Sequence, residues 1–406
     1  MSFFSGSKKR NELTLVFNIG SSSVTGAFFE AQSSGIPKII FSVRESIKVG
    51  KRIDVDRFLL LTIQALETVV NKVYEARIGA PTRIFCVLSS PWCVSQTRMI
   101  NLKKNTPFIF TEKLADELIQ KEIKLFEEEY SVKYSDADNS VRMIELKNIK
   151  TMLNGYETPK PLGQKTKELE MVIYISISGE RILKKIEDTI QKYFHLKQMR
   201  FCSFALSSFT VARDMYAQQE NFLLVDIGGE VTDIAMAKKN ILRESISFPL
   251  GRNFLTRGVA SGLGCTLGEA NSLISLLKDG HAEASVAKKL TAIMDKLRTE
   301  WLKKFQESLV NLSNDVSIPE TIYIVIDKDV ADFFSETIKT EQFSQYTLTE
   351  SKFKVIFLST ELLHDIAIFK ENIIREPFII IDSIYINRFL IHPFNSTLGG
   401  KTVGQI

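Results

Sequence analysis

The chain has 406 residues, 44% of them hydrophobic, and a net charge of +4 from 52 basic and 48 acidic side chains. This length favours two or more domains with sizeable cores, and so small a charge excess argues against a nucleic-acid-binding protein. The four cysteines and four histidines are scattered without metal-ligand spacing, which argues against a metal–thiolate site. The N-terminus lacks the apolar stretch of a signal peptide, and no uncharged run is long enough to span a membrane. We therefore expect a cytoplasmic protein.

The first predicted feature is a strand–turn–strand unit at residues 13–29, whose turn of small residues begins at Gly20. A third strand follows. Residues 54–76 are predicted to form a helix because apolar side chains recur there every three or four positions. An apolar strand at residues 83–88 completes this part of the chain.

The next hundred residues predict an α+β unit. Thr111 is a plausible N-cap for a helix that continues to about Tyr130. Strands are expected at residues 140–149 and 169–178, and an amphipathic helix at residues 180–194.

A second strand–turn–strand unit spans residues 221–237, and its turn reads Asp-Ile-Gly-Gly from Asp226. We expect its glycines, Gly228 and Gly229, to adopt positive φ angles that aim backbone N–H groups at one point. Asp226 could then hold a hydrated Mg²⁺ beside a phosphate. A plain surface hairpin is the alternative interpretation. The similar unit around Gly20 favours the phosphate interpretation, since two such turns predict a duplicated fold closing on one cleft.

The rest of the chain is predicted to be mostly helical. Helices are expected at residues 266–278 and 282–311, and strands at residues 322–326 and 352–358. Residues 377–393 are apolar and rich in β-branched side chains, so they predict one or two terminal strands.

The two strand–turn–strand units resemble the hairpins with which the actin/Hsp70/sugar-kinase superfamily grips the phosphates of ATP. The resemblance implies an α/β, two-domain actin-like ATPase fold built from duplicated RNase H-like domains. The α+β unit between them resembles the inserted (SHS2) subdomain of FtsA, the bacterial cell-division actin homologue. PilM, the actin-like protein of type IV pilus assembly, shares the layout. The FtsA resemblance covers roughly residues 12–310, and its motifs are Asn154-Gly155-Tyr156, Pro161-Leu162-Gly163, Leu169-Glu170 and Pro249-Leu250-Gly251.

This resemblance implies a division of the chain into domains. The predicted parts are a disordered tail (1–12), the first actin-like domain (13–93 and 198–220), the FtsA-type inserted subdomain (94–197), the second actin-like domain (221–394) and a flexible tail (395–406).

The resemblance also implies a nucleotide site, in which Asp226 is the metal ligand and no catalytic residue is assigned. Its candidate cofactor-binding residues are Asn18, Gly20, Ser21, Ser22, Asp226, Gly228, Gly229, Thr232 and Asn271.

Four positions depart from the family pattern. Asn18 replaces a carboxylate that would face the metal, and a neutral amide does not offset the charge of Mg²⁺. Glu230 replaces a small residue and would repel a polyphosphate. Asn271 and Asp327 alter the adenosine side. We therefore expect ATP and Mg²⁺ to bind weakly or not at all, without hydrolysis.

The resulting hypothesis is an FtsA-like scaffold that links filaments of the tubulin homologue FtsZ, or other divisome proteins, and self-associates head to tail. A PilM-like pilus platform and an active actin-like ATPase are the alternatives. FtsA normally ends in a basic amphipathic membrane helix, whereas this chain ends in a short Gly-rich tail. Contact with the inner face of the membrane or the division site is therefore expected to be indirect or weak.

Overall fold

The computed structural model describes residues 12–52, 54–133, 140–195, 199–312, 317–340 and 352–391. The tails predicted at residues 1–12 and 395–406 lie outside this part of the chain, apart from Glu12.

The N-terminal part of the chain builds a mixed sheet in which β1 pairs antiparallel with β2 and parallel with β4. The confirmed hairpin at residues 13–29 is β1 and β2 of this sheet. In spatial order the strands are β15 (Ile368–Phe369), β3 (Lys38–Ser46), β2 (Ser23–Glu30), β1 (Leu13–Ile19), β4 (Arg83–Leu88) and β9 (Met199–Ser203).

A second sheet repeats this topology. Its central strand β10 pairs antiparallel with β11 and parallel with β13, as β1 does with β2 and β4. The fold is therefore duplicated, as the two similar hairpins predict. In order the strands are β12 (Ile241–Phe248), β11 (Thr232–Lys238), β10 (Phe222–Ile227), β13 (Thr321–Ile326) and β14 (Lys354–Phe357).

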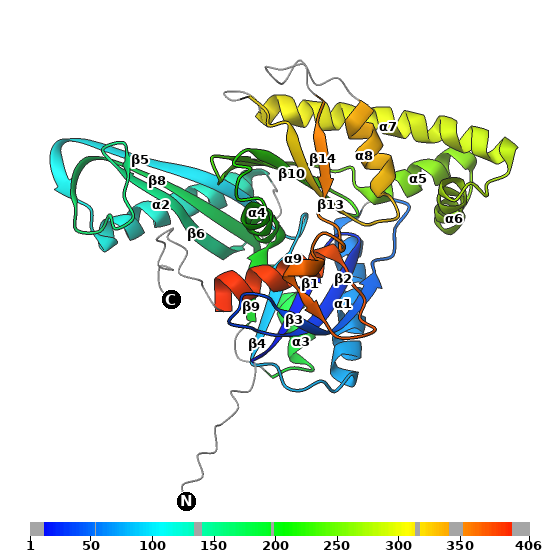
Figure 1. Cartoon of the computed structure of the whole chain (residues 1–406), viewed down its shortest axis with the longest axis horizontal. Helices are drawn as coiled ribbons and strands as arrows, with labels where there is room; N and C mark the ends of the chain where they lie inside the picture. Colours follow the sequence, from blue (N-terminus) through cyan, green and yellow to red (C-terminus); the bar gives the residue numbers. More distant parts are fainter. Residues whose placement is uncertain are drawn as a thin grey trace, which may run out of the picture.

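Helices and sheets alternate in layers (Figure 1). The outer face of the first sheet packs on α1 (Val55–Glu75) and α3 (Glu180–Gln191). Between the two sheets lie α4 (Phe204–Met215) and α9 (Pro377–Tyr385), which share one hydrophobic core with both. The far face of the second sheet is covered by α5 (Arg252–Leu263), α6 (Leu267–Lys278), α7 (Ala284–Leu312) and α8 (Ala331–Thr340).

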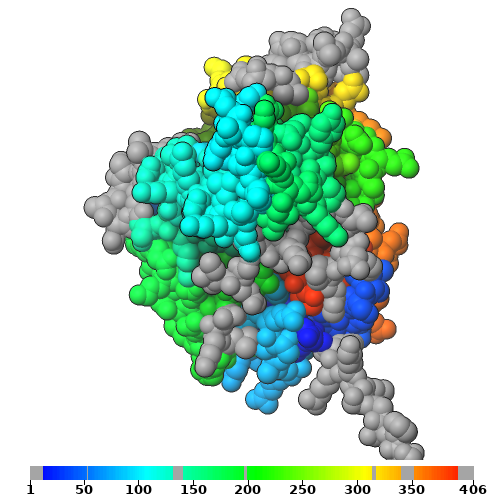
Figure 2. All heavy atoms as spheres, turned by 90° about the vertical axis from the view of Figure 1, so that its left-hand side faces the viewer, coloured from blue at the N-terminus to red at the C-terminus, as the bar shows by residue number. Residues whose placement is uncertain are grey.

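The α+β unit projects from the side of the first sheet (Figures 1 and 2). Its antiparallel sheet is covered on one face by α2 (Glu112–Lys133). Thr111 caps this helix as predicted, because its Oγ1 accepts a hydrogen bond from the backbone N–H of Leu114 at 3.2 Å. The sheet order is β5 (Val94–Ile109), β8 (Lys165–Gly179), β6 (Val141–Leu153) and β7 (Tyr156–Glu157).

The prediction of terminal strands at residues 377–393 is wrong. The described part of this segment is the helix α9, continued by a π-helical turn, η3 (Ile386–Ile391). Pro377 stands at the first helical position, where its missing N–H costs nothing. The helix α9 carries isoleucines around most of its circumference because it is buried between two sheets, and such burial overrides a β-branched preference for strands.

The chain also returns to the first sheet near its end, through β15, which pairs with β3, and α9, which contacts β1 and β2. The prediction that residues 221–394 form the second domain alone is corrected accordingly. Within the described residues, no helix is both long enough and apolar enough to cross a membrane.

Candidate functional site

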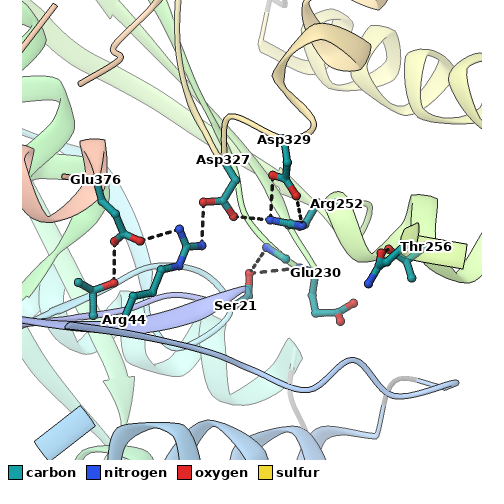
Figure 3. Close-up of polar contacts among 11 residues, drawn as sticks. Ser21, Arg44, Glu230, Arg252, Thr256, Asp327, Asp329 and Glu376 are labelled. Carbon is teal, nitrogen blue, oxygen red and sulfur yellow. Dashed lines mark hydrogen bonds and ion pairs between the residues drawn. The ribbon is translucent and has the colours of Figure 1, made fainter. Parts of the chain in front are cut away.

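The two hairpin tips touch each other directly. The Ser21 hydroxyl oxygen, in the first tip, accepts hydrogen bonds from the backbone N–H of Gly229 at 2.8 Å and of Glu230 at 3.1 Å (Figure 3). These are the donors that the sequence predicts to face a phosphate. In this structure they bind a side chain of the opposite hairpin instead.

Glycine is required at the second tip for space rather than for its φ angle. Neither Gly228 nor Gly229 has a positive φ, so that expectation was wrong. A Cβ on Gly229 would lie 2.2 Å from the carbonyl oxygen of Ser21, and one on Gly228 would lie 2.6 Å from the Ser21 hydroxyl. The tips are in van der Waals contact, which leaves no room for a phosphate between them.

The N-terminus of α5 is occupied in the same way. The backbone N–H groups of Arg252 and Asn253 donate to the carbonyl oxygens of Gly228 and Gly229, at 2.9 and 2.8 Å. Free N–H groups at a helix start form a ready anion site. Here the second hairpin takes them.

Glu230 does not face the hairpin gap, contrary to the expectation that it would repel a phosphate there. Its side chain points away from Ser21 (Figure 3) and is only 6% exposed. It accepts hydrogen bonds from Asn253 Nδ2 at 2.8 Å and from the guanidinium of Arg257, with which it forms an ion pair. Glu230 therefore fastens the second hairpin to α5.

An ion-pair network closes the crevice between the two sheets (Figure 3). Arg44, on β3, contacts Asp327 at 2.7 Å and Glu376 at 2.6 Å. Asp327 follows β13 of the second sheet and also contacts Arg252 at 2.7 Å. Glu376 accepts a further hydrogen bond from Thr25 Oγ1 on β2. Arg44 thus joins the first sheet to the loop that follows β13 of the second sheet.

Burial and ion pairing shift the pKa values of Asp327 and Glu376 in opposite directions. Burial would raise the pKa of Asp327, but Arg44 and Arg252 hold that pKa below its ordinary value. For Glu376, burial outweighs the single Arg44 contact, and the pKa is raised. Arg44 therefore interacts with one carboxyl group that is readily ionised and one that resists ionisation.

Asn18, which stands where the resemblance predicts a carboxylate, forms a hydrogen bond with the helix α9. Its Nδ2 donates to Asp382 Oδ2 of α9 at 2.7 Å, and Ser207 of α4 donates to the other carboxyl oxygen at 2.8 Å. Asp382 is fully buried, and burial raises its pKa to about 7 despite these two donors. The amide occupies a position where a second carboxylate would face Asp382.

Asp226 retains one feature of a metal ligand. Its Oδ1 atom is buried and has no hydrogen-bond partner among the described residues. Burial, followed by the charges of Asp233, Asp327 and Asp382, raises its pKa well above the ordinary value. Burial and the neighbouring carboxyl groups thus oppose ionisation of Asp226.

A magnesium–nucleotide unit does not fit the residues as they are arranged. Within the described residues, no cluster of three or more potential metal ligands forms. Asp226 offers one carboxylate, but the amide of Asn18 binds Asp382 and the N–H groups of the second tip bind Ser21. No step of a nucleotide reaction can be derived from this geometry.

The other predicted site residues have structural partners. Gly20 accepts a hydrogen bond from the Trp92 indole at 2.9 Å, and the Ser22 carbonyl accepts one from Ile47 N–H at 2.9 Å. Thr232 Oγ1 donates to a backbone carbonyl at 2.7 Å. Asn271 is exposed on α6 and accepts from Thr256 of α5 at 2.7 Å. Asn271 thus joins two helices of the second half.

Sequence reasoning did not identify the partners that close the crevice. The sequence did indicate that Asp382 is unusual, because it is an acidic residue in the middle of the isoleucine-rich run of α9. A charged residue in such a run is almost never buried unless it is paired. Arg44 and Glu376 left no comparable local signal.

No protein-family model and no curated relative matches the sequence. Among solved structures, the PilM-PilN type IV pilus biogenesis complex is similar, with a TM-score of 0.57 at 11% identity over 92% of this chain and 97% of that chain. An actin-like ATPase-fold protein of unknown function from Bacteroides thetaiotaomicron matches with a TM-score of 0.40 at 9% identity, covering 86% of this chain and 91% of that chain. Ethanolamine utilization protein EutJ from Carboxydothermus hydrogenoformans matches with a TM-score of 0.41 at 11% identity, covering 92% of this chain and 89% of that chain.

The chain has the two-domain actin-like fold. The predicted fold class is confirmed, and the duplicated sheets supply the internal evidence for it. At such low identity the similarity concerns the fold alone.

Proposed function

We propose that this protein is a scaffold of actin-like fold that binds partner proteins and does not turn over ATP. One observation carries the proposal: Ser21 occupies the N–H donors of Gly229 and Glu230. Those donors are the part of the fold that a nucleotide needs most. Losing one charged phosphate contact costs ~1.5–3 kcal/mol, and here several are engaged elsewhere.

Two scaffold roles are compatible with this proposal. An FtsA-like role, attaching FtsZ-type filaments or other divisome proteins, is supported by the sequence motifs of the inserted subdomain. A PilM-like platform role is supported by the similarity to the PilM-PilN complex, which extends over nearly the whole of both chains. In either role the protein would work at the inner face of the membrane through its partners.

Self-association is the second part of the proposal. The inserted subdomain of one copy would contact the second half of the next copy, which is a heterologous interface that propagates. Sedimentation velocity over a concentration series tests it. A species that stays monomeric at high concentration and on a partner template would contradict it.

Calorimetric titration with Mg-ATP tests the nucleotide part. We expect that Mg-ATP does not bind with a dissociation constant in the low micromolar range, and that no phosphate is released. Asp226→Asn is the matched variant because it keeps the shape of the side chain and removes the carboxylate that the sequence predicts to be the metal ligand. Micromolar binding that this variant abolishes would overturn the proposal.

The partner is tested with purified candidates from the same organism. FtsZ and the cytoplasmic segment of a PilN-type protein are each immobilised and titrated with this protein, with Mg-ATP and with EDTA. We expect one of the two to bind equally under both conditions. Binding that requires Mg-ATP would contradict a nucleotide-independent scaffold.

A further inference from the structure

A hollow of about 570 Å³ lies at the mouth of the crevice. Its residues Arg52 and Arg57 also line a smaller hollow that reaches Glu230 of the second hairpin tip. One wall of the larger hollow is formed by described residues between β3 and α1 and in the first turn of α1, among them Lys51, Arg52, Asp54 and Arg57. The other wall is Leu267, the first residue of α6 in the second half of the molecule. The two halves therefore meet at this hollow.

The charges of the hollow are unbalanced. Among the described residues that line it, Lys51, Arg52 and Arg57 carry three positive charges against the one negative charge of Asp54. All three cations are exposed, and in the described part of the chain none of them forms an ion pair. The neighbouring carboxylate of Asp56 is paired with Arg181 at 2.9 Å.

Nearby backbone donors are already used. Asp54 caps α1 by accepting the Arg57 backbone N–H at 2.7 Å. Thr266 and Glu269 form a capping box at the start of α6. A ligand in the hollow would therefore be bound by the cationic side chains and not by helix N–H groups.

We propose that this hollow binds a small anion carrying two or more phosphate charges. Its volume lies in the range of small-molecule sites, and its lining comes from one loop, one helix turn and one residue of α6, so it is too compact for an extended peptide. The forked guanidinium groups of Arg52 and Arg57 match phosphate oxygens in pairs. This site is separate from the hairpin tips and goes beyond the scaffold function.

The test is a calorimetric titration of the full chain with metal-free sodium tripolyphosphate at low salt, where surface charges are least screened. The variant is Arg52→Gln with Arg57→Gln. Its control is Lys113→Gln with Lys124→Gln, which removes the same charge from the exposed surface of α2. We expect saturable one-to-one binding that weakens tenfold or more in the variant and changes less than twofold in the control.

A variant of opposite sign sharpens the test. Asp54→Asn removes the negative charge from the hollow while asparagine remains an equally good N-cap. We expect it to tighten binding severalfold. Absence of saturable binding, equal weakening in variant and control, or no gain with Asp54→Asn would each overturn the proposal.

Phosphate groups reach a protein on soluble molecules or on lipid headgroups, and a second arm separates these sources. Vesicles with and without phosphatidic acid are sedimented with the wild type, the Arg52 and Arg57 variant and the control. Arginine-dependent binding to both tripolyphosphate and vesicles indicates a lipid source, and binding to tripolyphosphate alone indicates a soluble one. Arginine-independent binding in both arms would overturn the site.

Discussion

The hairpin tips and the hollow at the crevice mouth lie side by side but treat their polar groups in opposite ways. At the tips, the Ser21 hydroxyl binds the N–H groups of the opposite hairpin, and the carbonyl groups of that hairpin bind the start of α5. At the mouth, cationic side chains line a concave surface without ion-pair partners in the described residues. The contact between the tips, together with the ion pairs of Arg44, therefore forms a seam between the two sheets, whereas the hollow leaves its cations available to a ligand.

The largest effect expected at the seam comes from Arg44→Gln. Glu376 would lose its ion pair, while Asp327 would keep its contact with Arg252, and leaving a buried carboxylate without its cation costs up to about 3–5 kcal/mol. Urea unfolding at neutral pH measures the loss. Lys113→Gln is the control, since Lys113 and Glu117 form an exposed pair at 3.9 Å worth at most ~0.5 kcal/mol. Equal losses in the two variants would mean that the seam is not held by its ion pairs.

Gly229→Ala tests the contact between the tips. The new Cβ would lie 2.2 Å from a backbone oxygen, which cannot move without displacing the first hairpin. Overpacking of this kind costs about 1–3 kcal/mol, measurable as a shift of the urea midpoint. Gly268→Ala is the matched control, because its Cβ meets nothing within 4 Å and alanine favours a helix. A neutral Gly229→Ala would indicate that the tips are apart in solution.

Asp382→Asn tests the burial of an acid in the seam. The folded pKa of about 7 lies above the unfolded value, so the native state keeps the proton over a range where the unfolded chain has lost it. This contribution to stability is present below about pH 4 and is lost as the pH rises to about 7. We therefore expect the variant to gain stability relative to the wild type between pH 4 and pH 7.

Thermal unfolding at intervals across that range measures the difference. Part of the slope should survive in the variant, since the pKa values of Asp226 and Asp233 are also raised, mainly by burial. A difference between the two proteins that is constant with pH would contradict a raised pKa for Asp382.

The smallest effect is expected at the mouth. Removing both guanidinium groups with Arg52→Gln and Arg57→Gln should change the free energy of unfolding by no more than about 0.5 kcal/mol, because neither side chain has a structural partner in the described residues. The same urea experiment measures it. A loss as large as that of Arg44→Gln would mean that the hollow, too, is structural.

Local patterns in the sequence predicted the duplicated hairpins, the helix at residues 54–76 and the inserted α+β unit, because each depends on neighbouring residues. The bonds that close the seam join residues far apart in the chain, such as Arg44 with Asp327 and Asn18 with Asp382, and no local pattern reports them. The same limit explains the error at α9. An isoleucine-rich run looks like a strand until the two sheets that bury it are known.

The helix α9 also contacts the inserted subdomain. Glu145, on β6, accepts hydrogen bonds from Tyr385 of α9 at 2.8 Å and from the hydroxyl and backbone N–H of Ser203. Three residues earlier on the same helix, Asp382 holds Asn18. Figure 2 shows the end of this segment between the subdomain and the first sheet.

One short helix is thus clamped at Tyr385 by the subdomain and at Asp382 by the first hairpin. A partner that pulled on the subdomain would therefore transmit force through Tyr385 to α9, and from Asp382 of α9 to Asn18 of the first hairpin. Because Asn18 belongs to β1, that force would enter the middle of the first sheet through the Asn18–Asp382 hydrogen bond.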